Sequence, residues 1–514
     1  MNNNYGKKIL TNSALGILFK IMTLVLSLLS RYAFVFFLSD EHLGIQGLYT
    51  NLLSVLSMAD FGINAVMIYM LYEPLATQDK KKLAALMRLF RRLYWAIAGV
   101  VLLVGALLIP LLPYVVTENL LSTEELIKYY LLFLANSAIS YLGAYKSTLL
   151  IADQKGYFVN AILFASNTIR VVGQIAALYL TRDFIVFLFV MLFSTVLNNI
   201  ILTWIANRQY PAIKEEKEKV DLSNTKKRLI EKTKAVFLYR IGGTLIDSTD
   251  NILISILVGT VTVGYYSNYS IITTNLFALV SVVSQAYMTG IGNRSVQADM
   301  AEKKEAFYAM MLVYFFLGTV VLCGILSVMN DFIIIWLQQE QYVLSQGFVA
   351  VIAIRLFLDI ILSPNWAFRE AQGLFNEAKT IRICTAALNL ALSIVLGKLI
   401  GLIGIIGATA VSKVCTTLWF EPRVICKKVF NESTASYWKL WFKLIAATTC
   451  AVALSIGMTM WLDTCIQNSI LKILAKGISS TIAVIGTYAL LVFQEKQYSG
   501  LARSIKDKIK LLLR

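Results

Sequence analysis

Charged and catalytic residue types are scarce in this sequence. Of its 514 residues only 15% are charged and one is a histidine, His42, whereas 58% are hydrophobic. A soluble protein of this length would be about one quarter charged. The six cysteines show no CxxC or HExxH spacing, and the nucleotide-binding GxxxxGKS/T and hydrolase GxSxG motifs are absent. The sequence therefore predicts no metal site, no cofactor and no catalytic residues.

Long apolar runs stand in their place. Segments of 18 or more apolar residues recur along the chain, each long enough to cross the roughly 30 Å hydrocarbon core of a bilayer as a helix. Lipid offers the backbone no other hydrogen-bond partner, so spanning segments of this length are helical. We predict an all-α integral membrane protein with about fourteen transmembrane helices, at 12–38, 43–70, 92–117, 126–151, 157–180, 184–206, 235–258, 262–289, 306–330, 345–368, 378–400, 402–424, 438–462 and 470–493.

Basic residues divide the connecting loops into two sets. One set, which includes both ends of the chain, holds nearly all the loop lysines and arginines, and the opposite set holds only Arg182. This asymmetry predicts that both termini are cytoplasmic. It also accounts for the net charge of +17 without a nucleic-acid partner. We expect the basic tail at 494–514 to contact anionic membrane lipids.

The loops on the predicted outer side are short, and the longest lies near 331–344. A membrane glycosyltransferase or polymerase needs an external domain that holds its acceptor and its acid and base groups. Asp40 and Glu41 in the first outer loop offer only a faint trace of such a site. Transport is therefore the favoured class, and an enzyme is the alternative.

The chain repeats itself weakly at an interval of about 220 residues. A shift of 220 aligns 18–21 with 238–241, Gly44 with Gly264 and Tyr49 with Tyr269; shifts of 222 and 217 align 81–84 with 303–306 and 153–158 with 370–375. Six helices separate the copies, so we expect parallel repeats. The predicted organisation is two six-helix lobes at 1–206 and 235–424, a basic cytoplasmic linker at 207–234, a helix pair at 425–493 and the basic tail.

Ionisable side chains inside the predicted spans are the candidate functional residues. Each costs about 2.5–3.5 kcal/mol at mid-bilayer unless it faces protein or water. The basic set is Lys20, Arg31, Lys146, Arg170, Arg240, Arg355 and Lys413, and the smaller acidic set is Asp60, Asp247, Asp250 and Asp359. Because cations are in excess, we expect an anionic ligand, with Lys20, Arg31, Arg170, Arg240 and Arg355 as its binding residues.

At 100° per residue these charges fall on polar helix faces. The faces are Lys20, Thr23, Ser27 and Arg31; Asn136, Ser140 and Ser147; Asn167, Arg170 and Gln174; and Arg240, Asp247 and Asn251. Together they can line a hydrated cavity. Pairing between helices is the competing role. We predict an i,i+4 pair of Arg355 with Asp359, and all four acids are candidates for either pairing or ion coupling.

The organisation and two sequence segments resemble a known family. The run KKILTNSALG from Lys7, and Arg31 with LSDEHLGIQGLY across the first outer loop, are similar to Wzx-type flippases of the multidrug/oligosaccharidyl-lipid/polysaccharide exporter superfamily. The resemblance covers essentially the whole chain and rests on architecture more than on these degenerate segments.

This resemblance implies a V-shaped, two-lobed flippase in the bacterial plasma membrane. Its substrate would be a polyprenyl-diphosphate-linked oligosaccharide, turned from the inner to the outer leaflet for O-antigen, capsule or exopolysaccharide synthesis, with a polysaccharide polymerase and glycosyltransferases as protein partners. A lipid II flippase is a close alternative. A multidrug antiporter of the same superfamily is another, although its cationic substrates favour an acidic cavity. A membrane glycosyltransferase or polymerase is the alternative of a different class.

Overall fold

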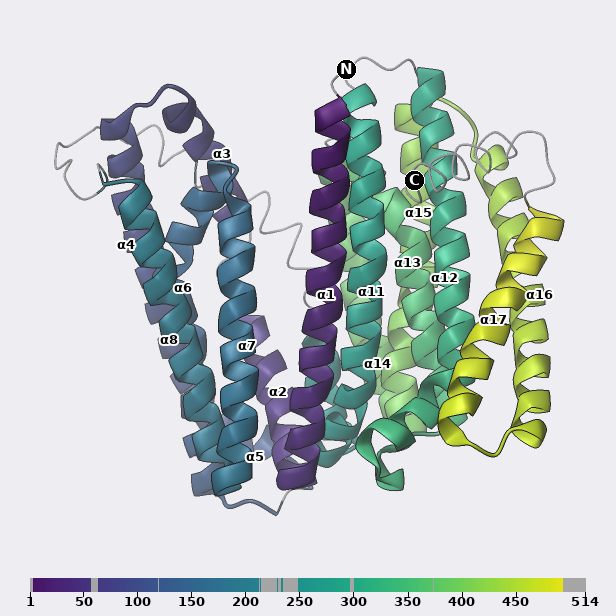
Figure 1. Ribbon diagram of the computed structural model, residues 1–514, viewed down its shortest axis with the longest axis horizontal. Helices are drawn as coiled ribbons and strands as arrows, with labels where there is room; N and C mark the ends of the chain where they lie inside the picture. Colours follow the sequence, from purple (N-terminus) through teal and green to yellow (C-terminus); the bar gives the residue numbers. More distant parts are fainter. Residues whose placement is uncertain are drawn as a thin grey trace. The chain divides into compact units, whose positions relative to one another are not determined.

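The computed structural model describes residues 3–56, 63–118, 120–211, 213, 229, 233, 248–295, 300–372 and 374–492. These residues are almost entirely α-helical and include no β-strand, which confirms the predicted all-α fold (Figure 1). Within this part of the chain, nine segments are long and apolar enough to cross a membrane. Most of the predicted linker at 207–234, and all of the tail at 494–514, lie outside the described residues.

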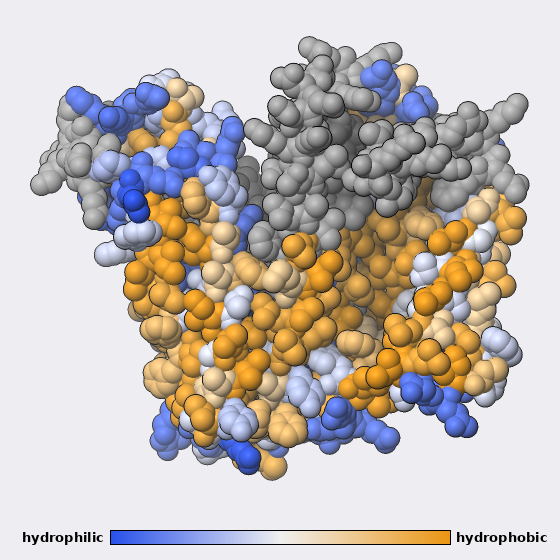
Figure 2. Space-filling model, viewed as in Figure 1, coloured by the Kyte–Doolittle hydropathy of each residue, from blue (hydrophilic) through white to orange (hydrophobic). Residues whose placement is uncertain are grey.

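The helix surfaces are apolar where those of a soluble protein would be polar. The most apolar window of Phe184–Gln209 has a mean hydropathy of 2.4, yet only 28% of it is buried. Leu107 and Leu180 are 74% and 77% exposed. In Figure 2 apolar side chains cover the middle of the visible surface and hydrophilic ones lie toward its edges. Apolar exposure on this scale requires lipid, so the protein is a multi-pass membrane protein.

The chain divides into two compact units. The N-terminal unit contains the described residues of 23–267 together with 397–401. Its elements are most of α1 (Asn3–Phe37), α2 (Asp40–Leu56), α3 (Ile63–Ala76), α4 (Lys80–Leu107), η2 (Ile109–Leu111), α5 (Leu112–Val115), α6 (Thr123–Ala152), α7 (Gly156–Thr181), α8 (Phe184–Gln209), a helical segment at 248–257 and the start of α11 (Thr260–Ser295).

The C-terminal unit contains the described residues of 1–22, 268–396 and 402–514. Its elements are the remainder of α11, α12 (Met300–Leu337), η3 (Glu340–Tyr342), α13 (Gln346–Ala371), α14 (Phe375–Cys415), α15 (Thr417–Val424), η4 (Ile425–Val429), α16 (Ala435–Cys465) and α17 (Ser469–Leu491).

Two predicted spans meet inside α14 without a loop. The helical geometry breaks at Ile400 and Gly401, and Gly401 has φ +62° and ψ −137°. The corresponding turn in the N-terminal unit follows α7, where Arg182 is left-handed with φ 53°. The break falls between the spans predicted at 378–400 and 402–424, because a glycine permits the reversal that other residues resist.

Helix boundaries follow the predicted repeat. α2 begins at Asp40 and α11 at Thr260, while α4 begins at Lys80 and α12 at Met300, so both pairs are 220 residues apart. α6 ends at Ala152 and α13 ends 219 residues later. The shift of 217 predicted for that turn is therefore two residues short.

The repeated tyrosines do equivalent work in the two units. Tyr49 and Tyr269 are both fully buried. The hydroxyl of Tyr49 donates to the carbonyl of Leu126 at 3.1 Å, at the start of α6. The hydroxyl of Tyr269 accepts from the amide of Leu344 at 2.8 Å, just before α13. Each tyrosine thus fastens its helix to the beginning of the corresponding later helix.

The repeated glycines permit a close helix contact within the N-terminal unit. A Cβ on Gly44 would overlap the carbonyl oxygen of Thr260, and a Cβ on Gly264 would lie 2.9 Å from the amide nitrogen of Gly44. Beside this crossing the hydroxyl of Tyr265 donates to Asp40 at 3.0 Å. α2 and α11 can approach this closely because neither glycine has a side chain.

The single histidine packs at the same end of the N-terminal unit as the start of α6 and α8. One ring nitrogen of His42 lies 2.8 Å from the hydroxyl of Ser39 and the other 3.3 Å from that of Tyr129. The ring also packs edge-on against Phe184. Burial lowers the pKa of His42 below its ordinary value, so this residue is a neutral packing group at pH 7.

Candidate functional site

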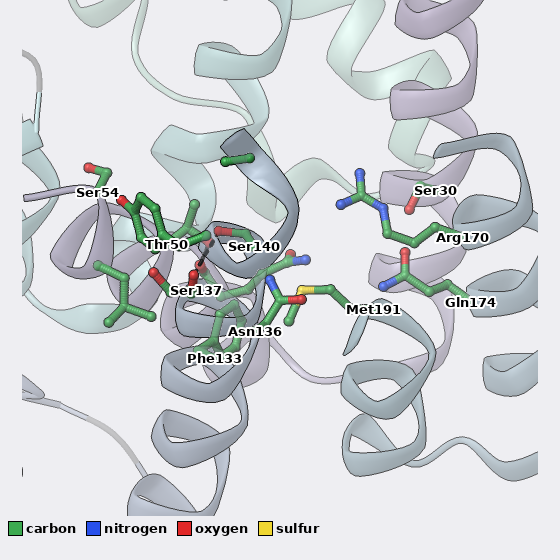
Figure 3. Close-up of a pocket in the computed structure, with 14 residues that line it drawn as sticks. Ser30, Thr50, Ser54, Phe133, Asn136, Ser137, Ser140, Arg170, Gln174 and Met191 are labelled. Atoms are coloured by element: carbon green, nitrogen blue, oxygen red, sulfur yellow. Dashed lines mark hydrogen bonds between the residues drawn. The ribbon is translucent and has the colours of Figure 1, made fainter. Parts of the chain in front are cut away.

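The N-terminal unit encloses a cavity of about 570 Å³, built by α1, α2, α6, α7 and α8 (Figure 3). Pockets of this size hold small-molecule ligands. Its described lining is Ser30, Gln46, Thr50, Leu53, Ser54, Phe133, Asn136, Ser137, Ser140, Tyr141, Ala144, Arg170, Gln174 and Met191.

Two of the predicted polar faces meet in this cavity. Asn136 and Ser140 come from α6, and Arg170 and Gln174 come from α7. Ser147 and Asn167, predicted on the same faces, do not line it. α6 is 30 residues long but is not among the nine most apolar segments, which is consistent with a helix that faces a polar space.

α8 holds the two lining helices in place. The hydroxyl of Thr195 donates to Asn136 at 2.6 Å, and the side-chain amide of Asn199 donates to the carbonyl of Ile139 at 2.6 Å. From α7, the side-chain amide of Gln174 donates to the carbonyl of Phe187 at 3.4 Å. These bonds fix the registers of α6 and α7 against α8, and so the positions of the polar groups in the cavity.

Arg170 is the one charged residue among the described residues that line the cavity. It donates from Nη2 to the side-chain oxygen of Asn167 at 2.5 Å. Its Nε is buried and finds no hydrogen-bond partner among the described residues. A buried guanidinium with an unused donor favours an anion, which can accept from several N–H groups at once.

The α2 side of the cavity was not predicted. Gln46, Thr50 and Ser54 lie four residues apart on α2, and all three line the cavity. The i, i+4, i+8 spacing was present in the sequence. Uncharged polar residues cost little in a span, however, so they attract less notice than an arginine.

The other predicted cations lie elsewhere. Lys20 is exposed on α1. Arg31 is half-buried, with its guanidinium 6.0 Å from the ring of Phe34, and is absent from the cavity lining although its neighbour Ser30 belongs to it. Arg355 is half-buried on α13 of the C-terminal unit. The structure therefore brings Arg170, but none of these three, to the cavity.

Three predicted residues fall outside the described part of the chain: Arg240, Asp60 and Asp247. Asp250, in the segment 248–257, is 1% exposed. A carboxyl group buried to this degree inside a helical unit fits the predicted pairing or coupling role better than open contact with a ligand.

Asp359 contacts a lysine that the sequence pattern did not pair with it. Lys413 of α14 donates to the Asp359 carboxylate at 2.5 Å. The predicted partner was Arg355, one helical turn away. The actual partner lies on another helix, and α14 brings its ammonium group to a carboxylate that is itself 20% exposed. Lys413 is thus a paired cation.

Lys146 and Lys476 also have partners. Lys146 donates to the side-chain oxygen of Asn207 at 2.8 Å. Lys476 contacts Asp331 at 2.6 Å and Asp463 at 2.8 Å. The predicted excess of buried cations is therefore reduced by pairing.

The arrangement of long apolar helices around a polar cavity defines a membrane transporter fold, and comparison with solved structures agrees. A structure titled lipid II flippase MurJ, inward closed conformation, matches with a TM-score of 0.70 at 14% identity, over 93% of this chain and 100% of that one. An inward-facing multidrug resistance MATE transporter of the MOP superfamily matches with a TM-score of 0.64 at 13% identity, over 80% of this chain and 98% of that one.

A third solved structure, a MOP superfamily transporter from Pyrococcus furiosus whose title describes a binding pocket of reverse polarity, matches with a TM-score of 0.59 at 13% identity, over 82% of this chain and 97% of that one. No curated protein sequence matches. The family of polysaccharide biosynthesis proteins matches residues 9–289, more than half of the chain. The protein belongs to this family and has the fold of the MOP superfamily.

Proposed function

We propose that the protein is a flippase that moves a polyprenyl-diphosphate-linked oligosaccharide from the inner to the outer leaflet of the bacterial plasma membrane. One observation carries the proposal. The described lining of the cavity has a single charge, the cation Arg170 with its unused Nε donor, and is otherwise neutral and rich in amides and hydroxyls. An anionic group attached to sugars fits this chemistry.

Energetics support export of such a substrate. A diphosphate cannot enter hydrocarbon unaided, since an unpaired charge is very costly there. Moving two negative charges outward across a membrane potential of about 100 mV, negative inside, releases roughly 4–5 kcal/mol. The potential can therefore favour the transfer. Glycosyltransferases would supply the lipid-linked sugars and a polymerase would consume them, which makes both classes candidate partners.

The lining argues against export of cationic drugs. Multidrug transporters are among the proteins of similar fold. A cationic drug would be attracted to a carboxylate, and none occurs in the described lining of the cavity, whereas Arg170 would repel it. The polarity of the cavity thus favours an anionic ligand.

The experiment is a complementation assay in a bacterial strain that lacks this gene. Arg170→Gln should lower surface polysaccharide about tenfold, because it removes charge-assisted hydrogen bonds. Protein level and membrane insertion should not change. Arg182→Gln is the matched control, since Arg182 is exposed at the end of the same helix and does not line the cavity. Wild-type output from Arg170→Gln at equal protein abundance would refute the proposed role of the cavity.

A lipid II flippase is the second candidate, because a solved structure with that title covers 93% of this chain. Its substrate is also a polyprenyl diphosphate. Depletion of the host's own lipid II flippase separates the two: rescue of growth by this protein would assign lipid II, and restored surface polysaccharide without rescue would assign an oligosaccharide repeat unit.

A further inference from the structure

The polar groups of the cavity gather at two sides. Figure 3 shows Arg170 and Gln174 of α7 with Ser30 of α1 on one side, and residues of α2 and α6 on the other, with Met191 between them. The second side contains Thr50, Ser54, Phe133, Asn136, Ser137 and Ser140. We call these the arginine side and the hydroxyl side. They differ in charge and in hydrogen-bonding character.

The hydroxyl side mainly offers acceptors. The hydroxyl of Thr50 donates to the carbonyl of Gln46 at 2.6 Å, and that of Ser140 donates to the carbonyl of Ser137 at 2.7 Å. The proton of each hydroxyl is thereby committed to its own helix, and the oxygen retains lone pairs. A ligand that fits here must bring donors of its own.

One donor on this side is held in a fixed orientation. Because Thr195 donates to the side-chain oxygen of Asn136 at 2.6 Å, the NH₂ group of that amide remains available to a ligand acceptor. Phe133 adds an apolar ring to the same lining. A row of acceptors, one amide donor and an aromatic ring match a sugar, which carries many hydroxyl donors, a ring oxygen and an apolar C–H face.

The arginine side has the opposite preference. Arg170 can only donate, and its Nε is without a partner. A phosphate oxygen suits it, and a sugar hydroxyl suits it less well, because charge-assisted hydrogen bonds are about twice as strong as neutral ones.

We propose that the hydroxyl side is a carbohydrate subsite for the sugar that is joined directly to the diphosphate, with the diphosphate against Arg170. This assignment rests on the proposed function and deepens it. The ligand is a neutral sugar, since the described lining of the hydroxyl side has no charge. A cavity of about 570 Å³ holds a ligand of drug size, so the rest of a repeat unit extends beyond it. Selection among sugars then lies in α2 and α6.

The test compares two lipids and two kinds of variant. The purified protein in lipid nanodiscs is titrated with a polyprenyl diphosphate, and with the same lipid carrying one glucose, galactose or N-acetylglucosamine. Wild type should bind at least one sugar-bearing lipid more tightly than the bare lipid. Thr50→Val and Ser140→Ala should each reduce that advantage about threefold to tenfold and leave affinity for the bare lipid unchanged. Arg170→Gln should weaken binding of both lipids equally.

Thr449→Val is the matched control. The hydroxyl of Thr449 is exposed on α16 and donates to the carbonyl of Ile445 one turn earlier, as that of Thr50 does in the cavity. It should leave both affinities unchanged. A sugar advantage that survives both Thr50→Val and Ser140→Ala would overturn the subsite, as would its absence from wild type. If wild type bound neither lipid, the proposed function itself would fail, which is a different result.

Discussion

Charged side chains inside this protein are mostly neutralised by a partner on another helix. Lys413 contacts Asp359, and the fully buried Arg369 donates to Glu421 at 2.8 Å. Arg170 differs, because its bonded partner is the neutral Asn167 and its Nε has no partner among the described residues. The contrast separates ion pairs that stabilise the fold from a cation placed for a ligand.

Removal of one member of a buried pair should cost more than removal of both. Lys413 and Asp359 are 8% and 20% exposed. Lys413→Met leaves a carboxylate in a poorly hydrated place, so we expect a loss of about 3 kcal/mol, seen as a lower melting temperature in detergent. The double variant Lys413→Met, Asp359→Leu should recover most of it.

The control for this comparison is Lys128→Met. Lys128 pairs with Glu124 on the surface of α6, where the two side chains are 55% and 77% exposed. Surface pairs contribute about 0–1 kcal/mol, so the melting temperature should hardly change. A double variant as unstable as Lys413→Met alone would contradict a pairing role and would return Asp359 to the candidates for ion coupling.

At the scale of elements, the last two helices are joined to α12 by polar contacts in layers. Thr319 lies 2.8 Å from Thr448 and 2.9 Å from Tyr488. Further along, the hydroxyls of Ser327, Ser455 and Ser480 lie within 3.1 Å of one another, followed by the contacts of Lys476 with Asp331 and Asp463. Hydrogen bonds between helices supply association energy in lipid, where the hydrophobic effect is lost. The helix pair α16–α17 is therefore bound to α12 by its polar residues.

The turn inside α14 makes a prediction about one glycine. Gly401 has φ +62° and no atom within 4 Å of a Cβ built on it, so a substitution there acts through the backbone alone. Gly401→Ala should cost about 1–2 kcal/mol, because an L-residue is strained in this conformation. Thermal unfolding of the purified protein measures the loss.

Gly477→Ala provides the comparison. Gly477 also has open space around its Cβ position, but it lies within α17. Alanine is favoured over glycine in a helix by about 0.5–1 kcal/mol, so this variant should be as stable as wild type or more so. If the two substitutions had the same effect, the turn at Gly401 would not depend on its backbone conformation.

The sequence predicted these elements well and their partners poorly. Hydropathy located the spans, and helical periodicity predicted that Asn136 and Ser140, and Arg170 and Gln174, would face one space, because both properties are local. The ion pair of Lys413 with Asp359 joins two helices, and no local pattern specifies which faces meet. The α2 side of the cavity was missed for a different reason, since Gln46, Thr50 and Ser54 carry no charge.

The orientation of the whole molecule in the membrane gives a prediction of its own. The basic loops predict that both termini are cytoplasmic. Reporter fusions after Gln209 and after Gln494 should report the cytoplasm, and a fusion after Gln339, in the turn between α12 and α13, should report the outside. Paired reporters, one active on each side, make the measurement. A cytoplasmic signal after Gln339 would mean that the predicted number of spans is wrong.

Gly44 and Gly264 hold the same position in the two repeats, and they touch. In a symmetric dimer, a residue at the two-fold axis meets its own copy. A gene for a single six-helix half would have placed one glycine on both sides of such a contact, and a single mutation would have struck it twice. In the fused chain the two codons change separately, yet a side chain added to either glycine still displaces the helix of the other. The halves can diverge in their cavities while sharing an inherited constraint where they cross.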